Sequence, residues 1–411
     1  MVTGLRSPAL RHVLTHLVTP LLMCLGMGLA YMGAFVTPEP HHLPVAVVGS
    51  GAETKVFAQT VKDAAGGKLD VRTVATRAEA VGLLRSRDIT GAYVPGTGSP
   101  ELVVATAASD MGATAVEKVF TPVAARQGEV LKVTDVAPTV ADDPTGQGLF
   151  FLLIALSIGS YASVAALGAA GAELPLRIRA LLAVGVSAVV GAIGALLAGP
   201  VFHLAHHDLA SLWGVAWLYS AGILFIGVGL HTFLKRWTTL AMMVLFVMLN
   251  FTSSGGLFRP ELQNGFFGAL HSFWNGAGFV EGIRSLLYFG RDGLSGDIGT
   301  LVVWLVVGLL VTAVAGAVER GRARKAVREE RRSFRRRSQN GTAARGSGSG
   351  RRHGNGRPRR SWRSRSSSDG SCKVTVPAVE RPSPGVAEEV GPITASSGRV
   401  LSPRVDAAQR R

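Results

Sequence analysis

The stretch GLFFLLIALSIGSYASVAALGAAGA, residues 148–172, decides the fold. It carries no charged side chain, and about 20 apolar residues suffice for a helix to cross the roughly 30 Å hydrocarbon core of a bilayer. Five other stretches have the same character, at 13–36, 180–202, 212–234, 238–258 and 298–318. The sequence therefore predicts an α-helical polytopic membrane protein with about six transmembrane helices.

Composition agrees with a membrane class, because 47% of the residues are hydrophobic and only 17% are charged. The formal net charge of +16 is concentrated in residues 319–411, which hold 24 of the 43 Lys and Arg and 8 of the 27 Asp and Glu. The first 318 residues therefore carry 19 charges of each sign. The excess basic charge thus belongs to one C-terminal segment, and no specific nucleic-acid partner is expected of the folded part.

Basic residues also predict the orientation of the chain. They precede the first apolar stretch and follow the second, fourth and sixth, at Arg6, Arg11, Arg177, Arg179, Lys235, Arg236 and in the tail. By the positive-inside rule both termini are cytoplasmic. Heavy use of Ala, Gly, Val and Arg is typical of a GC-rich bacterium, which gives a bacterial cell membrane as the location. A cleaved signal peptide is the alternative interpretation of residues 1–36.

Residues 37–147, between the first two apolar stretches, change character and predict an extracytoplasmic α/β domain. Short β-type stretches at 44–48, 69–74, 89–94, 101–105 and 131–136 alternate with helical ones at 52–65, 77–87 and 111–125. Gly49-Ser50-Gly51 follows the first strand as in a dinucleotide-binding turn, but Thr54 occupies the third glycine position. We interpret it as a strand-to-helix turn, with ligand binding as the lesser option.

Two further segments complete the organisation. Within the membrane domain, 148–318, residues 259–297 combine polar residues with many aromatics, which favours interfacial or re-entrant helices. Residues 319–411 are rich in Arg, Ser and Gly and are predicted to be a disordered polybasic cytoplasmic tail. Such a tail attracts anionic lipids or other polyanions, and the clearest contact candidates are Arg335, Arg336, Arg337, Arg359 and Arg360. A solvated topology anchor is the alternative.

The sequence contains few motifs for catalysis or for binding of a cofactor or metal. The sequence has no Gly-x-x-x-x-Gly-Lys-Ser/Thr loop, no nucleophile elbow and no His-Glu-x-x-His pair, so no catalytic residue and no cofactor are predicted. The spacing of His203, His206 and His207 makes them weak metal candidates, with a solvated loop as the default. Small residues recur every four positions and predict close helix packing at Ser187, Gly191, Ala195, Gly199, Gly308, Thr312 and Gly316.

The order of these parts resembles the permeases of type-2 ABC exporters and the related phage-infection-protein family. The resemblance is sharpest where Ser253-Ser254-Gly255-Gly256-Leu257-Phe258-Arg259-Pro260-Glu261-Leu262 is followed by Phe266-Phe267, Leu270-His271 and Gly282-Ile283-Arg284-Ser285-Leu286-Leu287-Tyr288. Asn264 stands where the family has proline, and the basic tail lies outside the family pattern.

This resemblance implies a transporter permease rather than an enzyme. The chain would dimerise with itself or a related chain, and an ATP-binding cassette subunit would act in trans. The cytoplasmic turn Glu173, Arg177 and Arg179 would receive the ATPase's motion. Glu281 and Arg284 would face the outer end of the substrate path or pair with one another. The alternative is a non-transporting membrane scaffold, with a secretion or phage-receptor role, that binds a partner through its outside domain.

Overall fold

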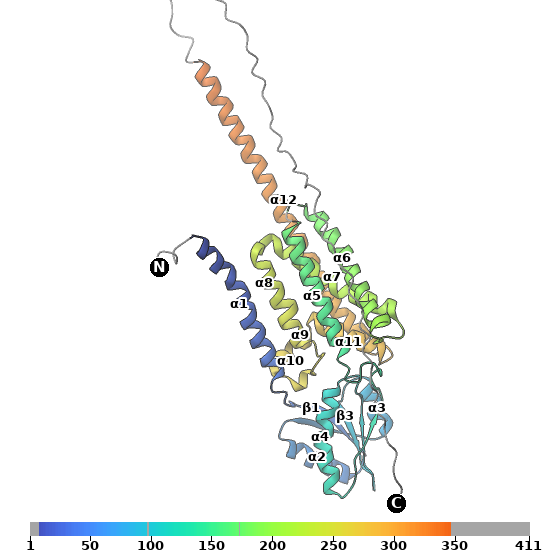
Figure 1. Cartoon of the computed structure of the whole chain (residues 1–411). Coiled ribbons are helices and arrows are strands. Elements are labelled where there is room, and N and C mark those ends of the chain that lie inside the picture. Colours follow the sequence, from blue (N-terminus) through green and yellow to red (C-terminus); the bar gives the residue numbers. More distant parts are fainter. Residues whose placement is uncertain (1–7, 97, 172, 347–411) are drawn as a thin grey trace, which may run out of the picture. The chain divides into compact units, whose positions relative to one another are not determined.

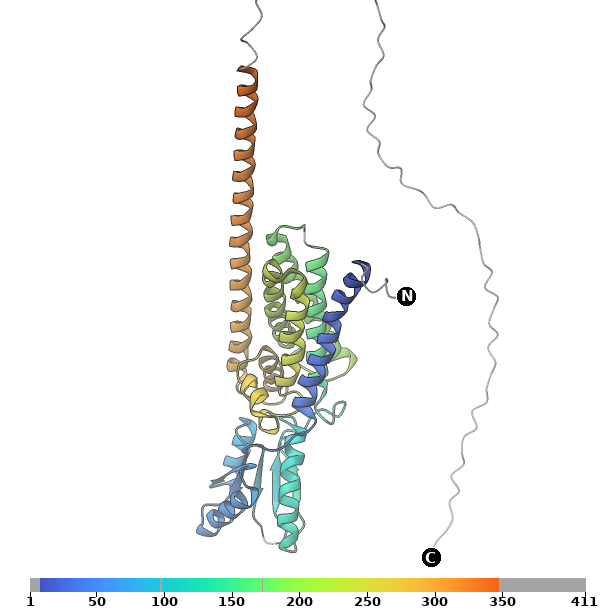
Figure 2. The same ribbon diagram turned by 90° about the vertical axis from the view of Figure 1, so that its left-hand side faces the viewer.

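The computed structural model describes residues 8–96, 98–171 and 173–346. Within them, five helical stretches are long and apolar enough to cross a membrane. These are His12–Phe35, Gly148–Ala169, Leu176–Val201, Leu209–Ser253 and Leu294–Ser333. The protein is therefore mostly helical, and Figures 1 and 2 show the helices side by side with the sheet beyond one end of them.

The fourth of these stretches, 45 residues long, is a helical hairpin and contains two of the predicted segments. The chain reverses at Lys235, whose φ of 48° interrupts the helix. Asn250 accordingly hydrogen-bonds Tyr219, and Thr238 lies beside His231. The first leg is α7 (Leu209–Leu234); after a 3₁₀ turn (Lys235–Trp237), the second leg comprises α8 (Thr238–Met243), a π-helical turn (Val244–Met248) and α9 (Leu249–Ser253). The second leg ends at Ser253, five residues before the predicted end.

The remaining long helices are α1 (Pro8–Phe35), α5 (Gly148–Ala169), α6 (Leu176–Leu196) and α12 (Leu294–Gly346). A π-helical turn at Leu197–Val201 ends α6, where Pro200 removes a backbone donor. The hydrophobic core of the bundle is formed by buried residues of α5, α7, the second leg of the hairpin and α11, among them Leu153, Tyr219, Phe246 and Phe279.

Small residues lie where the long helices come into close contact. A Cβ at Gly191 would lie 2.9 Å from the backbone nitrogen of Trp217, so α6 and α7 approach to backbone contact there. At Gly308 a Cβ would lie 3.1 Å from the Gly222 oxygen, and the Thr312 hydroxyl donates to the Phe225 carbonyl at 2.7 Å. The other predicted positions also lie in packed places: Ser187 is buried, Ala195 is partly buried against the core, Gly199 faces Leu209, and Gly316 faces Leu176.

The α/β domain (37–147) holds a five-stranded sheet in the order β2-β1-β3-β4-β5. Its strands are β1 (Leu43–Val48), β2 (Leu69–Val74), β3 (Gly91–Val94), β4 (Glu101–Val104) and β5 (Lys132–Asp135), and only the β3–β4 pairing is antiparallel. The strands and helices fall where the sequence predicts them. Because side chains alternate along β1, Leu43, Val45 and Val47 face one layer and Ala46 faces the other.

The helices of this domain cover both faces of the sheet. The helices α2 (Ala52–Ala65) and α4 (Asp110–Arg126) share one core, and α3 (Arg77–Arg85) packs into the other. Each core also contains a residue from the 259–297 segment: Leu262 is buried in the first and Phe289 in the second. The α/β domain therefore completes its cores with residues of the 259–297 segment.

The segment 259–297 forms a 3₁₀ turn (Pro260–Leu262), α10 (Gly265–His271) and α11 (Asn275–Leu287). Asn264 caps α10 by accepting from the Phe267 nitrogen at 3.3 Å, and its amide donates to the Gly33 oxygen of α1 at 3.0 Å. Nearly every residue of α11 is buried, among α5, α7 and α9. Its 13 residues span roughly 20 Å, which is less than a bilayer core.

Order continues past residue 318, which corrects the predicted start of the disordered tail at residue 319. Helix α12 runs on to Gly346. The reason is local, because residues 319–337 are rich in Arg, Glu, Ala and Lys, which favour helix, and acidic and basic residues stand three to four positions apart. Arg335, Arg336 and Arg337 lie on this helix, while Arg359 and Arg360 lie outside the described residues.

Candidate functional site: a buried ionic junction

The site begins where α9 ends inside the protein. A helix leaves its last carbonyls without partners, and three side chains of the 259–297 segment supply them here. The Gln263 amide donates to the Thr252 oxygen at 2.8 Å, and the His271 Nδ1 lies 3.0 Å from the Ser253 oxygen. The Arg284 guanidinium donates to the oxygens of Gly255 at 3.0 Å and Gly256 at 3.4 Å.

Glycine is required at this helix end. Gly255 has a φ of 70°, and a Cβ there would lie 2.6 Å from Cε1 of His271. Any side chain would therefore displace the imidazole as well as strain the backbone. The Ser253-Ser254-Gly255-Gly256 stretch is thus a close-packed break in a helix, held by a buried arginine.

Arg284 also pairs with Glu281 one helical turn earlier, at 2.6 Å between Nη1 and Oε1. The arginine side chain is 4% exposed and the glutamate 21%. The ion pair that the spacing predicts is therefore present. Its arginine is buried and its glutamate is partly buried, so the pair is not a solvated surface pair. A gating role for these two residues stays a prediction.

Arg87, in the loop after α3, brings the α/β domain to the same carboxylate. Its Nη1 lies 2.7 Å from Glu281 Oε2, and its Nη2 donates to the Ser285 hydroxyl at 2.7 Å. Asp297 Oδ2 lies 3.8 Å from the same Nη2. The guanidinium lies over the Phe289 ring, 5.4 Å from the ring centroid. Nothing in the sequence singles out Arg87.

A third arginine closes the cluster. Arg259 donates to the carbonyl oxygen of Arg87 at 3.2 Å and pairs with Glu261 at 3.2 Å. We name these six charged residues the ionic junction: Arg87, Arg259, Glu261, Glu281, Arg284 and Asp297. Three positive and three negative groups balance, so the cluster, which is largely but not fully buried, has no net charge.

The electrostatics of the junction favour the ionised form of its two glutamates. Burial alone raises the pKa of Glu281, but the nearby charges of Arg284 and Arg87 outweigh burial and hold the pKa at about 2. Burial likewise raises the pKa of Glu261, but the nearby charge of Arg259 outweighs burial, and the pKa is lowered. Both carboxylates are therefore charged at neutral pH.

A second, uncharged cluster lies deeper in the bundle. The Asn250 amide donates to the Tyr219 hydroxyl at 2.5 Å and to the Ser157 hydroxyl at 3.3 Å, and the Asn275 amide lies 3.4 Å from the Tyr219 carbonyl. All four side chains are fully buried. Among the described atoms, Oδ1 of Asn250 and Oδ1 of Asn275 have no hydrogen-bond partner. We name these four residues the polar centre; hydrogen bonds of this kind hold apolar helices together.

The predicted coupling turn divides into two kinds of residue. Glu173 and Arg177 are exposed. Arg179 instead is buried, and its Nη2 lies 2.6 Å from Glu319 Oε1, which also accepts from the Thr232 hydroxyl at 2.9 Å. Arg179 is therefore paired inside the protein, because α12 continues far enough to bring Glu319 against α6. A coupling role for the three residues stays a prediction.

The histidine candidates do not converge. His203, His206 and His207 lie in a loop before α7 rather than on a helix, and the rings of His203 and His206 are 6.3 Å apart. His207 Nε2 lies 4.0 Å from Asp208, whose other oxygen pairs with Arg291. Over the part of the chain that the structure describes, no three His, Cys, Asp or Glu side chains are arranged to hold a metal ion.

Comparisons of the chain with protein-family models, with curated proteins and with solved structures gave no match.

Proposed function

We propose that the chain is the membrane-spanning permease subunit of an ATP-driven exporter. The observation that carries this proposal is the ionic junction at the break between α9 and α11. Buried charges and interrupted helices are costly among membrane helices, and they are characteristic of transport pathways, where helix ends and charged side chains change partners between states.

In this proposal the membrane is crossed six times, with both helices of the α7 to α9 hairpin as separate crossings. Both termini are cytoplasmic and the α/β domain is extracytoplasmic. Lys235 and Arg236 at the tip of the hairpin, and Arg177 at the start of α6, then lie on the same side as α12's basic extension. The membrane is that of a bacterial cell.

The junction then acts as the outer gate. Arg87 fixes the α/β domain to α11, and Arg284 fixes α11 to the end of α9. A movement of α11 must therefore exchange these partners, and it would expose the polar centre beneath, where two amide oxygens lack partners. Hydrogen-bonding groups of this kind suit a polar or amphiphilic cargo more than a bare ion.

A separate ATPase subunit would act at the cytoplasmic turn. Exposed Glu173 and Arg177 offer both signs of charge, and Pro175 stiffens the turn. A groove of about 800 Å³ lies beside the turn, between Leu176 and Arg177 on one side and Gly316 and Arg320 of α12 on the other. A helix of a partner subunit could dock there, and two permease chains would form the complete transporter.

The experiment is copurification. The full chain is extracted in mild detergent from the membranes that produce it naturally, and the eluate is assayed for ATP hydrolysis and for the bound subunits. An ATP-hydrolysing partner in stoichiometric amount supports the proposal. A chain that purifies without such a partner, while it is folded and monodisperse, would reject it.

Topology is tested separately. After Cys24 and Cys372 are replaced, single cysteines at Ser99 and Ser333 are treated with a membrane-impermeant thiol reagent in intact cells. Both serines are exposed. We expect labelling at position 99 only, and labelling at position 333 would overturn the proposed orientation.

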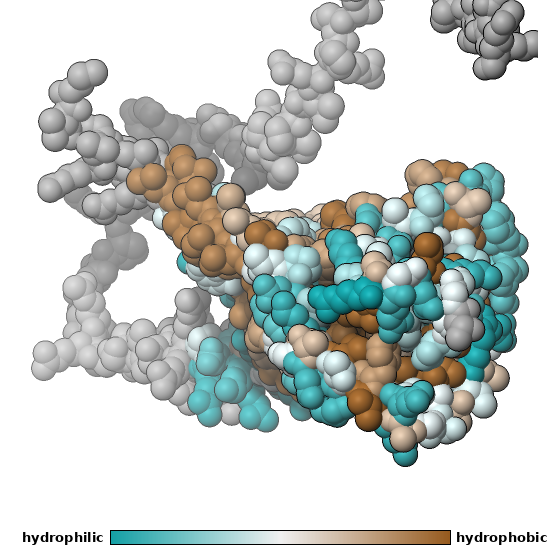
Figure 3. Space-filling model, turned by 90° about the horizontal axis from the view of Figure 1, so that it is seen from below, coloured by the Kyte–Doolittle hydropathy of each residue, from teal (hydrophilic) through white to brown (hydrophobic). Residues whose placement is uncertain are grey.

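A second candidate function has its own observation. A cavity of about 400 Å³ lies between α2 and α4 on the α/β domain, lined by Phe57, Val61, Val119 and Val123. Figure 3 views the molecule from this end and shows hydrophobic residues between hydrophilic ones. A membrane scaffold would use such a groove to bind a partner, and recovery of a stable extracytoplasmic partner with no ATPase would favour it.

A further inference from the structure

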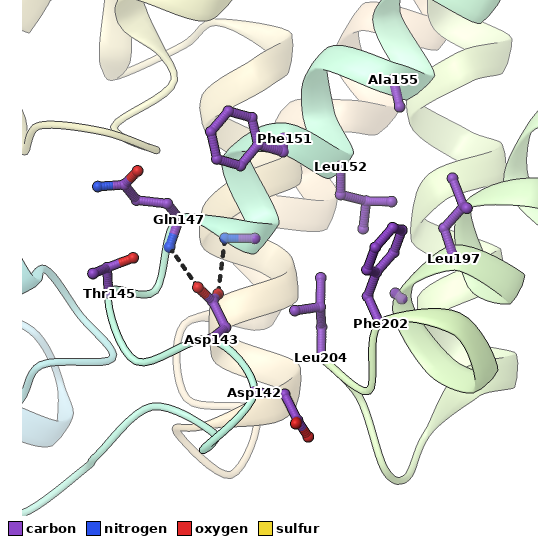
Figure 4. Close-up of a pocket in the computed structure, with 12 residues that line it drawn as sticks. Asp142, Asp143, Thr145, Gln147, Phe151, Leu152, Ala155, Leu197, Phe202 and Leu204 are labelled. Atoms are coloured by element: carbon purple, nitrogen blue, oxygen red, sulfur yellow. Dashed lines mark hydrogen bonds between the residues drawn. The ribbon is translucent and has the colours of Figure 1, made fainter. Parts of the chain in front are cut away.

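A cavity of about 430 Å³ lies between the start of α5 and the end of α6, away from the ionic junction. Its walls are apolar and include Leu152 and Ala155 from α5 with Leu197, Phe202 and Leu204 from the other side. Figure 4 shows Leu152, Phe202 and Leu204 converging, with Asp142 at the rim. Its volume is typical of a binding site for a small molecule.

The cavity opens toward the surroundings of the helices rather than into the bundle. Phe151 and Phe202, which line it, are 60% and 59% exposed. Phe151 belongs to a helical stretch with the apolar character of a membrane segment, and Phe202 directly follows another, so their exposed rings face acyl chains in a bilayer. The apolar part of the cavity is therefore reached from the lipid.

The rim of the cavity carries negative charge only. Asp143 caps α5, where its Oδ1 accepts from the Gln147 nitrogen at 3.1 Å and its Oδ2 from the Gly148 nitrogen at 2.8 Å. Asp142 beside it is exposed. No lysine or arginine is among the described residues that line the cavity, so two carboxylates stand at the mouth of an apolar site without a cation.

We infer that this cavity binds a lipid of the surrounding bilayer whose headgroup carries a primary ammonium. Its acyl chain occupies the apolar space between Leu152 and Leu204, and its ammonium lies at Asp142. Charge complementarity selects this occupant, because an ammonium donates charge-assisted hydrogen bonds to a carboxylate whereas a trimethylammonium has no N–H to donate. An anionic lipid is repelled by the same rim.

Binding at this site does not require transport, so it is tested by photolabelling alone. The full-length protein is reconstituted in nanodiscs that contain phosphatidylethanolamine with a diazirine in one acyl chain, and the labelled peptides are identified by mass spectrometry. Phosphatidylcholine and phosphatidylglycerol with the same chain serve as probes of the headgroup. We expect phosphatidylethanolamine to label residues 151–155 and 197–204.

Two variants have matched controls. Ala155→Trp fills the cavity, and Ala162→Trp places the same bulk on the same face of α5, outside the cavity; both alanines are exposed. Asp142→Asn removes the rim charge, and Asp292→Asn removes an exposed charge elsewhere. We expect labelling to fall about tenfold in A155W and in D142N, and to be unchanged in both controls.

Each other outcome overturns the inference. Equal labelling by phosphatidylcholine, or unchanged labelling in D142N, would show that the headgroup is not recognised at Asp142. Labelling spread evenly over the lipid-facing helices, or unchanged by A155W, would show that the cavity is not a binding site.

Discussion

Nη1 of Arg87 lies 2.7 Å from Oε2 of Glu281, although 194 residues separate them in the chain. One residue belongs to the α/β domain and the other to α11, so this contact fixes a domain of five strands to the interrupted helices of the bundle. The same glutamate binds Arg284, which in turn caps the end of α9. Glu281 therefore connects the α/β domain both to α11 and to the end of α9.

Arg87→Gln should destabilise the full chain. The substitution leaves Glu281 and Asp297 with less positive charge around them, in a place where the paired side chains are 14% and 21% exposed. Because this pair is neither exposed nor fully buried, its loss should lower the free energy of unfolding by about 2 kcal/mol. Unfolding in mild detergent measures it. Arg77→Gln is the control, because Arg77 of the Arg77–Glu101 pair is 46% exposed, and its loss should lower the free energy of unfolding by less than about 1 kcal/mol.

Acid should weaken the junction. The pKa of Glu281 is about 2 in the folded protein against an ordinary value of 4.5, so its ionised form stabilises the fold at and above pH 4.5 and that contribution is lost as the pH falls through the folded pKa. Comparison of wild type with Glu281→Gln should show a difference of roughly 3 kcal/mol at pH 7 that shrinks between about pH 4.5 and 2. A difference that stays constant over this range would contradict the assignment.

Helix packing is tested at two glycines of α6. Gly191→Ala should cost about 1–3 kcal/mol, because its Cβ would be 2.9 Å from the backbone of Trp217 and α6 would have to move from α7. Gly185→Ala meets no atom within 4 Å and should be neutral or stabilising by up to about 1 kcal/mol. Thermal stability in detergent measures both, and equal effects would argue against the close crossing.

Arg179→Gln should destabilise the protein while Arg177→Gln should not. Arg179 is buried and joins α6 to α12 through Glu319, whereas Arg177 is exposed. The loss expected for the buried arginine is about 2–4 kcal/mol. Unfolding curves of the two single variants measure these effects. An R179Q variant as stable as wild type would show that the Arg179–Glu319 pair does not stabilise the fold.

The sequence predicted most of the fold because local patterns determine it. Uncharged apolar stretches located the long helices, and alternation placed the β1 strand within one residue. The extension of α12 was missed because its composition was interpreted as solvated charge, although Arg, Glu and Ala also favour helix. With that extension missed, Glu319 was not recognised as the partner of Arg179.

The candidate site was predictable only in part. Glu281 and Arg284 stand one helical turn apart, and this spacing is visible in the sequence. Arg87 has no such signal, because its partners lie about 200 residues away and its position depends on how the α/β domain meets α11. The polar centre was missed for a similar reason: each of its four residues is unremarkable in its own helix, and only packing brings them together.

The most direct test of the central claim is the ATP hydrolysis that copurifies with the full-length chain, measured for wild type and for Glu173→Gln/Arg177→Gln. Both residues are exposed at the turn, so the double variant should fold and insert normally. If the chain is an exporter permease, wild type carries an ATPase and the double variant loses the bound subunit or its stimulated activity. Copurified ATPase that is unaffected by the double variant would contradict coupling at this turn, and the absence of any ATPase from folded wild type would contradict the exporter itself.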